Sequence, residues 1–145
     1  MKTLNKDYQS TFLQSVFDVT VHLNGDALEA DVTFHERHEG PPGHAHGGSI
    51  ATVLDEMMGT LAWASGHKAV AGRLSVDYRQ PVPLKVPHRV TCRIDERRGR
   101  KVFISADLLG PDGTVRAQSE GIFFDLGEDF HALKDKAEAA RQDIA

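Results

Sequence analysis

Residues 47–65 have the sequence GGSIATVLDEMMGTLAWAS, in which apolar residues recur at intervals of three and four positions. This spacing predicts an α-helix from Ser49 to Ser65, with Ser49 as its N-cap and Gly66 as the residue that ends it. The predicted helix is apolar on most of its sides, so we expect it to be buried at the centre of the fold. Its broadest apolar stripe consists of Ile50, Val53, Leu54, Met57, Met58 and Leu61.

Two strand-like segments precede this helix. Apolar residues occupy alternate positions from Phe17 to Leu23 and again from Leu28 to Phe34, with the turn sequence Asn24-Gly25-Asp26 between them. A period of two is typical of a half-buried strand, so the pair predicts a β-hairpin. Residues 35–46 then form a loop that carries Gly40, Pro41, Pro42, Gly43 and four histidines.

Four further strands are predicted after the helix, at residues 70–78, 90–94, 102–108 and 115–124, and they are separated by turn residues such as Pro111-Asp112-Gly113. An Ala-, Lys- and Glu-rich segment at about 128–143 predicts a mostly exposed C-terminal helix. The order is therefore β-β-α-β-β-β-β. We expect an α+β fold in which one antiparallel sheet wraps a single buried helix. Residues 1–145 form a single domain, with its core at about 15–125.

The composition indicates a soluble globular protein. Of 145 residues, 40% are apolar and 26% are charged, and the formal net charge is −4. An acidic chain is a poor binder of nucleic acid, and the apolar stretch around Asp55 is too short to cross a membrane. No disulfide can form within the chain because Cys92 is its only cysteine. The N-terminal residues lack an apolar signal segment, so we expect a cytoplasmic protein.

Asp55 and the glycine pair at the start of the helix are the strongest candidates for chemistry. A carboxylate within an apolar stretch is costly to bury, and this cost indicates a function such as nucleophile or general base. Gly47 and Gly48 open the helix, where backbone N–H groups have no partner within the helix and face the positive end of its dipole. Such N–H groups can stabilise a developing oxyanion.

The spacing of these candidates predicts a dimer. Gly47 and Asp55 are eight residues apart, roughly 12 Å along one helix. Both cannot flank one carbonyl group from a single chain. Two antiparallel helices related by a two-fold axis would bring Gly47 of one subunit near Asp55 of the other, giving two composite sites.

The sequence from Glu39 to Asp55 resembles the hotdog-fold thioesterase superfamily, and above all the branch with phenylacetyl-CoA thioesterases and mitochondrial thioesterase-superfamily members. Residues 74–84, LSVDYRQPVPL, and residues 99–103, GRKVF, are similar to that branch too. The similarity covers roughly residues 28–125. It implies the hotdog fold, hydrolysis of an acyl-CoA thioester with no cofactor besides the CoA of the substrate, a homodimer, and a dimer of such dimers.

The resemblance also implies roles for individual residues. His46 would orient the loop or the thioester. Met57, Met58 and Trp63 would either pack in the core or border the acyl group at the far end of the helix. Related enzymes often carry Ser or Thr sixteen residues after the catalytic acid, whereas this chain has Ala71 there, and Thr60, Ser65 or Ser75 are candidates to replace it. The candidates to hold the phosphates of CoA are basic residues of the central strand, Arg73 and Arg79, and of a hairpin turn, Arg98, Arg100 and Lys101; the alternative for the hairpin residues is a solvated turn without a ligand.

A metal site and two other functions have to be weighed against this reading of the sequence. The histidines at 35, 38, 44 and 46 are spaced too loosely to favour a metal site, and we predict none. A hydroxyacyl dehydratase of the same fold would use His46 and Asp55 together to move a proton and eliminate water. A non-catalytic acyl-CoA-binding protein would explain the missing hydroxyl at Ala71. The acyl group itself, fatty or aromatic, is not determined by the sequence.

Overall fold

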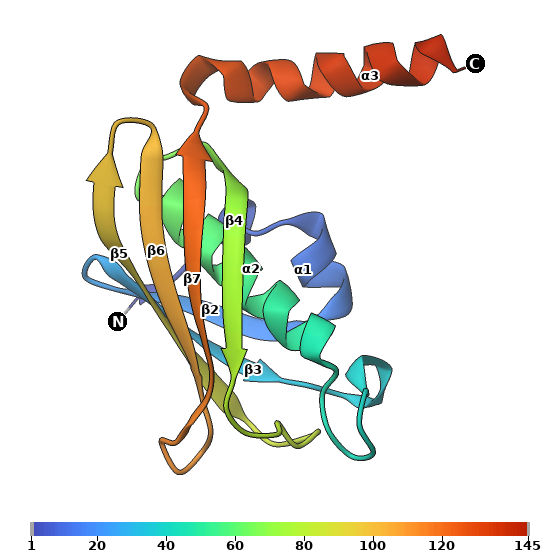
Figure 1. Ribbon diagram of the computed structural model, residues 1–145, viewed down its shortest axis with the longest axis vertical. Coiled ribbons are helices and arrows are strands. Elements are labelled where there is room, and N and C mark those ends of the chain that lie inside the picture. The colour runs from blue at the N-terminus through green and yellow to red at the C-terminus, as the bar shows by residue number, and fades with distance from the viewer. Residues whose placement is uncertain (1, 145) are drawn as a thin grey trace.

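The computed structural model describes residues 2–144, and it contains one antiparallel sheet and one central helix (Figure 1). The seven strands follow the spatial order β1-β2-β3-β5-β6-β7-β4. Their bounds are Lys2–Thr3 (β1), Asp18–Asn24 (β2), Ala27–Thr33 (β3), Ala69–Tyr78 (β4), His88–Arg98 (β5), Lys101–Leu109 (β6) and Val115–Asp125 (β7). The predicted α+β hotdog arrangement is confirmed.

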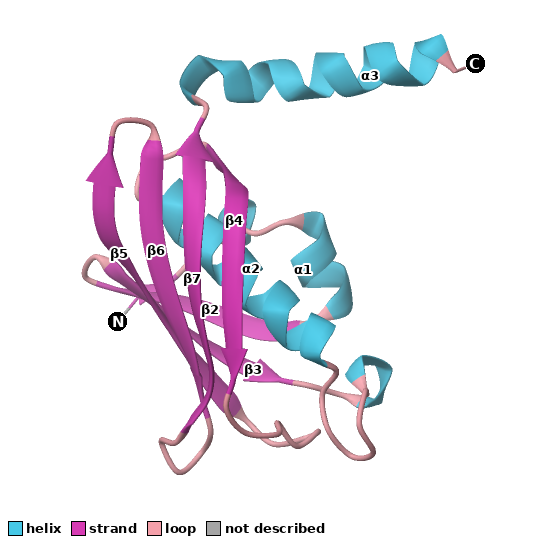
Figure 2. Cartoon of the chain, viewed as in Figure 1, coloured by secondary structure: helices cyan, strands magenta, loops and turns pink. Residues whose placement is uncertain are grey.

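Helix α2, Gly47–Ala64, lies across one face of the curved sheet (Figure 2). Strands β4, β5, β6 and β7 cover it from one side, and the shorter helix α1, Thr11–Val16, lies beside it. Three 3-10 turns complete the chain, namely η1 (Lys6–Tyr8), η2 (Glu36–His38) and η3 (Gly127–Ala132). The C-terminal helix α3, Leu133–Asp143, has no buried residue and extends away from the end of the sheet.

The core lies between α2 and the inner face of the sheet. Val53, Leu54, Met57 and Met58 of α2 have no exposed surface. They meet inward-facing residues that alternate along the strands, as the period-two pattern predicts, such as Ile104, Ala106, Leu108 and Ala117. The expected central helix is thus confirmed, and its apolar stripe is the main surface on which the sheet packs.

Elements at the N-terminus were not expected from the sequence. Strand β1 pairs with β2, with Lys2 opposite Leu23, and Ser10 caps α1 by accepting a hydrogen bond from the N–H of Leu13 at 3.0 Å. Leu13 is buried and anchors this segment against the body of the fold. The segment is too short for its periodicity to stand out, which is why pattern alone did not indicate it.

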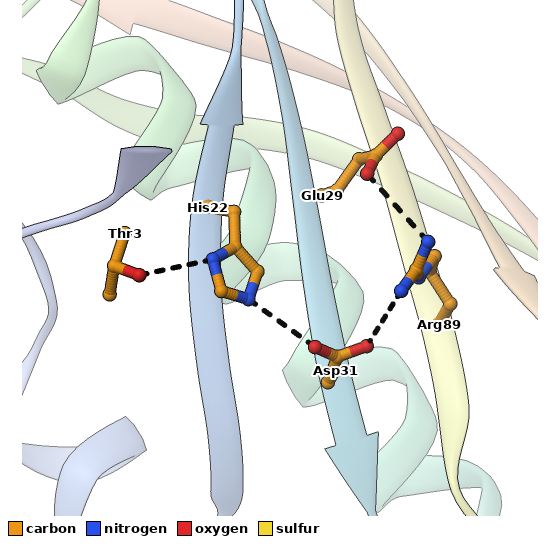
Figure 3. A network of polar contacts seen from close by, with 5 residues as sticks. All are labelled: Thr3, His22, Glu29, Asp31 and Arg89. Carbon is orange, nitrogen blue, oxygen red and sulfur yellow. Dashed lines mark hydrogen bonds and ion pairs between the residues drawn. The ribbon is translucent and has the colours of Figure 1, made fainter. Parts of the chain in front are cut away.

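The outer face of the sheet, turned away from α2, is charged. Figure 3 shows a chain of polar contacts across β1, β2, β3 and β5 on this face. His22 lies 3.3 Å from both the Thr3 hydroxyl and the Asp31 carboxylate, and Asp31 in turn accepts a hydrogen bond from Arg89 at 3.2 Å. These residues are partly or largely exposed, so the network contributes little to stability.

Strand β4 is the edge of the sheet. It pairs with β7 along its full length, and no other strand of the described chain covers its second edge. Six of its ten residues are exposed, among them Ala71, Arg73 and Ser75. An unpaired strand of this length presents a row of free backbone N–H and C=O groups that favours pairing with another strand.

Because Leu54 is fully buried between α2 and the sheet, the change Leu54→Ala should leave a cavity. We expect the free energy of unfolding to fall by about 2–5 kcal/mol, measured by urea denaturation. The matched change Leu133→Ala, on exposed helix α3, should alter it by less than about 0.5 kcal/mol. Equal losses of unfolding free energy for the two variants would contradict the burial of Leu54 between α2 and the sheet.

Candidate active site

Helix α2 begins at Gly47, two residues before the predicted start. The N-cap is His46, whose Nδ1 accepts a hydrogen bond from the N–H of Gly48 at 2.8 Å. Ser49 was predicted as the cap, and that prediction is wrong because Ser49 already lies inside the first turn. Since Nδ1 is an acceptor, the neutral imidazole carries its proton on Nε2 and can donate a hydrogen bond outward.

Of the two predicted oxyanion donors, the N–H of Gly47 is the free one. No residue among 2–144 accepts a hydrogen bond from it, whereas the N–H of Gly48 is held by His46. The Tyr78 hydroxyl donates to the carbonyl oxygen of Gly47 at 2.7 Å. A side chain at position 47 would begin 3.4 Å from the Tyr78 ring, so the glycine keeps this corner open. Tyr78 therefore fixes the Gly47–Gly48 peptide, which directly follows the peptide that carries the free donor.

The role of Tyr78 was not predicted from the sequence. Tyr78 lies within residues 74–84, which carry part of the family resemblance. Nothing in this local pattern indicates that the Tyr78 hydroxyl reaches the start of α2. The contact joins two segments 31 positions apart, at the far end of edge strand β4.

Asp55 is half-buried in the middle of α2. Burial raises the pKa of its carboxyl group, because desolvation disfavours the charged form. Among the described residues, none donates a hydrogen bond to the Asp55 carboxylate and none forms an ion pair with it. The carboxylate is therefore free to act on a ligand. Among residues 2–144 the carboxylate thus has no hydrogen-bond partner that would give it a purely structural role.

Glu56 is also half-buried, and burial raises its pKa, with a smaller contribution from neighbouring Asp55. The two carboxylates differ in their partners, however, because Glu56 accepts a hydrogen bond from the Ser10 hydroxyl at 2.8 Å. Glu56 is therefore engaged in joining α2 to the N-terminal segment, and Asp55 is the unengaged acid of the pair.

The structure places no hydroxyl where the family pattern has Ser or Thr. Ala71 is exposed near the start of β4. Thr60 is buried and donates to the carbonyl oxygen of Glu56 at 2.7 Å, and Ser65 caps the far end of α2. Ser75 lies opposite Glu120 of β7 in the strand register, on the outer face of the sheet. None of the three candidates therefore replaces the missing hydroxyl within one chain.

The predicted CoA-binding residues fall into separate groups. Arg79 follows Tyr78 at the Gly47 end of the fold, and Arg73 lies on the outer face of β4 opposite Ile122. The hairpin residues, Arg98, Arg100 and Lys101, lie at the other end of β4. There the N–H of Asp125 donates to the carbonyl oxygen of Arg100 at 2.8 Å. There Arg98 pairs with Glu96, Arg100 donates to the backbone of Asp125, and Lys101 lies over the ring of Phe124.

Met58 does not border a ligand space in this chain. Its side chain is fully buried, and its sulfur would lie 2.8 Å from a Cβ placed on Gly121. The sequence left core packing and a contact with the acyl group open for Met58, and the close approach of β7 favours core packing. Helical spacing alone does not distinguish the core side of a helix from the side that lines a cavity.

The four loop histidines each have a different partner. His35 pairs with Asp18 at 3.0 Å, and His38 is buried in a stack on Phe17, where desolvation lowers its pKa. His44 contacts the carbonyl oxygen of Pro42, and His46 caps α2. Within residues 2–144 no three side chains of His, Cys, Asp or Glu lie together as a metal site would require. No helix in the same range is long and apolar enough to cross a membrane.

A hotdog fold whose central helix opens with a free glycine amide and carries an unengaged, half-buried carboxylate has the parts of a thioester-hydrolysing site. The chain belongs to the thioesterase superfamily, whose sequence pattern matches residues 42–117. This range contains Gly47, Asp55 and Tyr78.

Named relatives support the assignment. The chain is 35% identical over 92 residues to acyl-coenzyme A thioesterase THEM4 from Rattus norvegicus, a match that covers 63% of this chain and 40% of the relative. The chain thus spans about two fifths of the length of the curated relatives it matches.

Solved structures show the same fold. The thioesterase superfamily protein RHA08564 is 33% identical, with a TM-score of 0.70 over 74% of this chain and 53% of that protein. A hypothetical thioesterase from Streptococcus pneumoniae, solved with coenzyme A, has a TM-score of 0.72 over 76% of this chain and 90% of its own. At 15% identity, the second shows a likeness of fold alone.

Asp55→Asn should raise the melting temperature at neutral pH. The folded-state pKa of Asp55 is raised, so the ionised carboxylate opposes folding at any pH above that pKa, and a neutral amide removes this cost. The difference in melting temperature between Asp55→Asn and the wild type should shrink as the pH falls. It should vanish below about pH 3.9, where the Asp55 carboxyl group is neutral in both the folded and the unfolded state. Thermal melts across this range measure it, with Glu138→Gln on exposed α3 as the control. A lower melting temperature for Asp55→Asn at neutral pH would mean that the carboxylate makes a stabilising contact.

Proposed function

We propose that this protein is an acyl-CoA thioesterase that hydrolyses a fatty or aromatic acyl-CoA to the free acid and CoA. The observation that carries the proposal is the pairing, on one helix, of an unengaged half-buried Asp55 with the free N–H of Gly47. One group can activate water or attack the thioester, and the other can stabilise the oxyanion that either attack creates. Similarity to acyl-coenzyme A thioesterases supports this choice of substrate.

The active unit is a homodimer with composite sites. Gly47 and Asp55 stand eight residues apart on a continuous helix, which keeps them roughly 12 Å apart in one chain. The free edge of β4 and the half-exposed Asp55 side of α2 lie on the surfaces that a second copy would cover. Pairing two β4 edges about a two-fold axis would extend the sheet and set the two α2 helices antiparallel. The dimer of dimers and the cytoplasmic location remain predictions.

Each site residue has a separate task in this proposal. Asp55 acts as nucleophile or as general base toward water, and its raised pKa brings it closer to the working pH of a base. Gly47 of the partner subunit donates to the oxyanion. His46 and Tyr78 hold the turn that presents this donor, through contacts of 2.8 Å and 2.7 Å. Arg79 directly follows Tyr78, whose hydroxyl reaches this turn, and is proposed to contact the phosphates of CoA, with Arg73 and the hairpin residues as further candidates.

Two other functions make different predictions. A hydroxyacyl dehydratase would need His46 to exchange protons with substrate, yet the Nδ1 of His46 is engaged in capping α2. A non-catalytic acyl-CoA-binding protein is favoured by one observation, the absence of a hydroxyl at Ala71. Hydration of an enoyl-CoA would identify the first, and binding of acyl-CoA without release of CoA would identify the second.

Asp55→Asn should lower kcat for CoA release by about 10²–10⁴-fold, because an amide neither attacks nor accepts a proton. Release of thiol from a panel of fatty and aromatic acyl-CoAs measures it, and the panel identifies the acyl class. KM should change little, since the fold and the binding surfaces are retained. Glu56→Gln serves as the neighbouring carboxylate control and should retain most of the wild-type kcat. Wild-type protein that binds acyl-CoA and releases no thiol would contradict the proposal.

Mixed dimers test the composite site. Asp55→Asn and Gly47→Val should each be nearly inactive as homodimers, the second because its side chain stands over the donor amide. After unfolding and refolding together, half of the dimers are mixed and each has one intact site, so about one quarter of the wild-type sites return. Circular dichroism confirms that Gly47→Val folds. If both groups acted within one chain, no activity would return on mixing.

A further inference from the structure

Arg116 lies at the end of the sheet where β7 meets the last residues of β4 (Figure 1). It is the extra residue of a β-bulge, since Leu108 of β6 pairs with Ala117 and the next residue of β6 pairs with Val115. A bulge turns a side chain out of the regular alternation of its strand. The Arg116 side chain is only 17% exposed, and no sequence pattern indicated a role for it.

The surroundings of the guanidinium group do little to stabilise it. A Cβ placed on Gly110 would lie 2.6 Å from the Nε of Arg116, so the group lies against the backbone of the β6–β7 turn. This Nε is buried and has no hydrogen-bond partner among residues 2–144. The carboxylate of Asp112 is 3.8 Å from Nη2 and is 60% exposed, which makes it a weak ion-pair partner. The contacts that hold the side chain in place are therefore those of Nη1.

Both the backbone and the side chain of Arg116 hold the segment that follows β4. The carbonyl oxygen of Arg116 accepts hydrogen bonds from the N–H groups of Arg79 at 2.8 Å and Gln80 at 3.1 Å. Its Nη1 donates to the side-chain oxygen of Gln80 and to the carbonyl oxygen of Pro81, both at 3.2 Å. Gln80 and Pro81 are exposed. Hydrogen bonds to Arg116, and not burial, therefore fix the path of the chain after Tyr78.

The segment held in this way supports the loop that leads into α2. The carbonyl oxygen of Val82 accepts a hydrogen bond from the N–H of Ala45 at 2.8 Å. The N–H of Leu84 donates to the carbonyl oxygen of Gly43 at 3.0 Å. These two segments thus form a short antiparallel ladder, and it ends one residue before His46, the N-cap of α2.

Two paths therefore lead from Arg116 to the turn with the free amide of Gly47. The first runs through its carbonyl oxygen to the end of β4, where the Tyr78 hydroxyl donates to the carbonyl oxygen of Gly47 at 2.7 Å. The second runs through Nη1 to Pro81, along the ladder and on to the cap residue His46. A donor to an oxyanion is effective only where the surrounding structure holds it in place before the reaction.

We propose that Arg116 is a positioning residue of the candidate site, and that its side-chain contacts with Gln80 and Pro81 hold the Gly47 turn in place. This inference rests on the proposed thioesterase function and adds to it a residue of β7 that lies outside the site. The hydrogen bonds from the Arg79 and Gln80 amides go to a backbone oxygen, so they persist whatever side chain stands at position 116. Loss of the Arg116 side chain should therefore loosen the turn and leave the strand pairing intact.

Arg116→Ala should lower kcat for CoA release by about 10–100-fold, because a small displacement of an oxyanion donor is costly in the transition state. KM should stay within about 3-fold of the wild-type value, since the candidate CoA-binding residues are unchanged. The matched control is Arg89→Ala, an arginine on the outer face that is 49% exposed, and it should retain the wild-type kcat. An unchanged kcat in Arg116→Ala, or a loss confined to KM, would overturn the proposal.

Amide hydrogen exchange tests the same role without hydrolysis. In Arg116→Ala the amides of Ala45 and Gly48 should exchange at least about 10-fold faster than in the wild type, because their hydrogen bonds lie on the path from Pro81 to the cap. The amide of Leu54, in the core of α2, should keep its rate. Unchanged exchange at Ala45 and Gly48 would overturn the proposal. Equally faster exchange at Leu54 would do so too, because it would show a general loss of stability.

Gln80→Ala is the second variant, and it removes one side-chain contact of Arg116 from an exposed position. It should change kcat and the exchange of Ala45 in the same direction as Arg116→Ala, by a smaller factor. If Arg116→Ala does not fold, unchanged kcat and exchange in Gln80→Ala would overturn the proposal. Wild-type protein that releases no thiol would count against the thioesterase function, and exchange at Ala45 and Gly48 would then still decide the role of Arg116.

Discussion

A single helix can bury only one side of itself against the sheet of its own chain. In α2 this side carries Val53, Leu54, Met57 and Met58, and their burial fixes the rotation of the helix. The opposite side is left half-covered, and Asp55, Gly59 and Trp63 stand on it at intervals of four residues. The placement of the candidate site thus depends on core packing. Any change that rotates α2 would move the Asp55 carboxylate, Gly59 and Trp63 together.

The second constraint is electrostatic. Both Asp55 and Glu56 are half-buried and have raised pKa values. Desolvation of these two adjacent carboxylates therefore lowers the stability of the fold. For Glu56 the cost is offset by the hydrogen bond from Ser10, which also ties the N-terminal segment to α2. For Asp55 no contact within the chain offsets it. An uncompensated carboxylate of this kind is expected where function, and not stability, determines the residue.

Much of the fold was predictable because its signals are local. The β2–β3 hairpin follows from alternation around Asn24-Gly25, and the end of α2 follows from Gly66, which has a φ of 90°. The start of α2 was placed two residues late because His46 provides the cap, and a histidine is not among the usual N-cap residues. Tyr78 and Phe130 escaped prediction for a different reason. Each acts through a contact with α2 from a distant segment, and periodicity carries no information on such pairs.

The same reasoning explains why the acid could be identified from the sequence while the cavity beside Glu56 could not. An acid within an apolar helix is conspicuous in one dimension. A cavity exists only where segments converge, and here η1, α2, β4 and η3 come from both ends and the middle of the chain. Two of these segments, η1 and η3, lie outside the central sheet and helix. Substitutions in η1 and η3 can therefore reshape the cavity while the core of α2, and with it the position of Asp55, stays in place. The wall of this cavity and the position of the acid are thereby set by parts of the structure that can change independently.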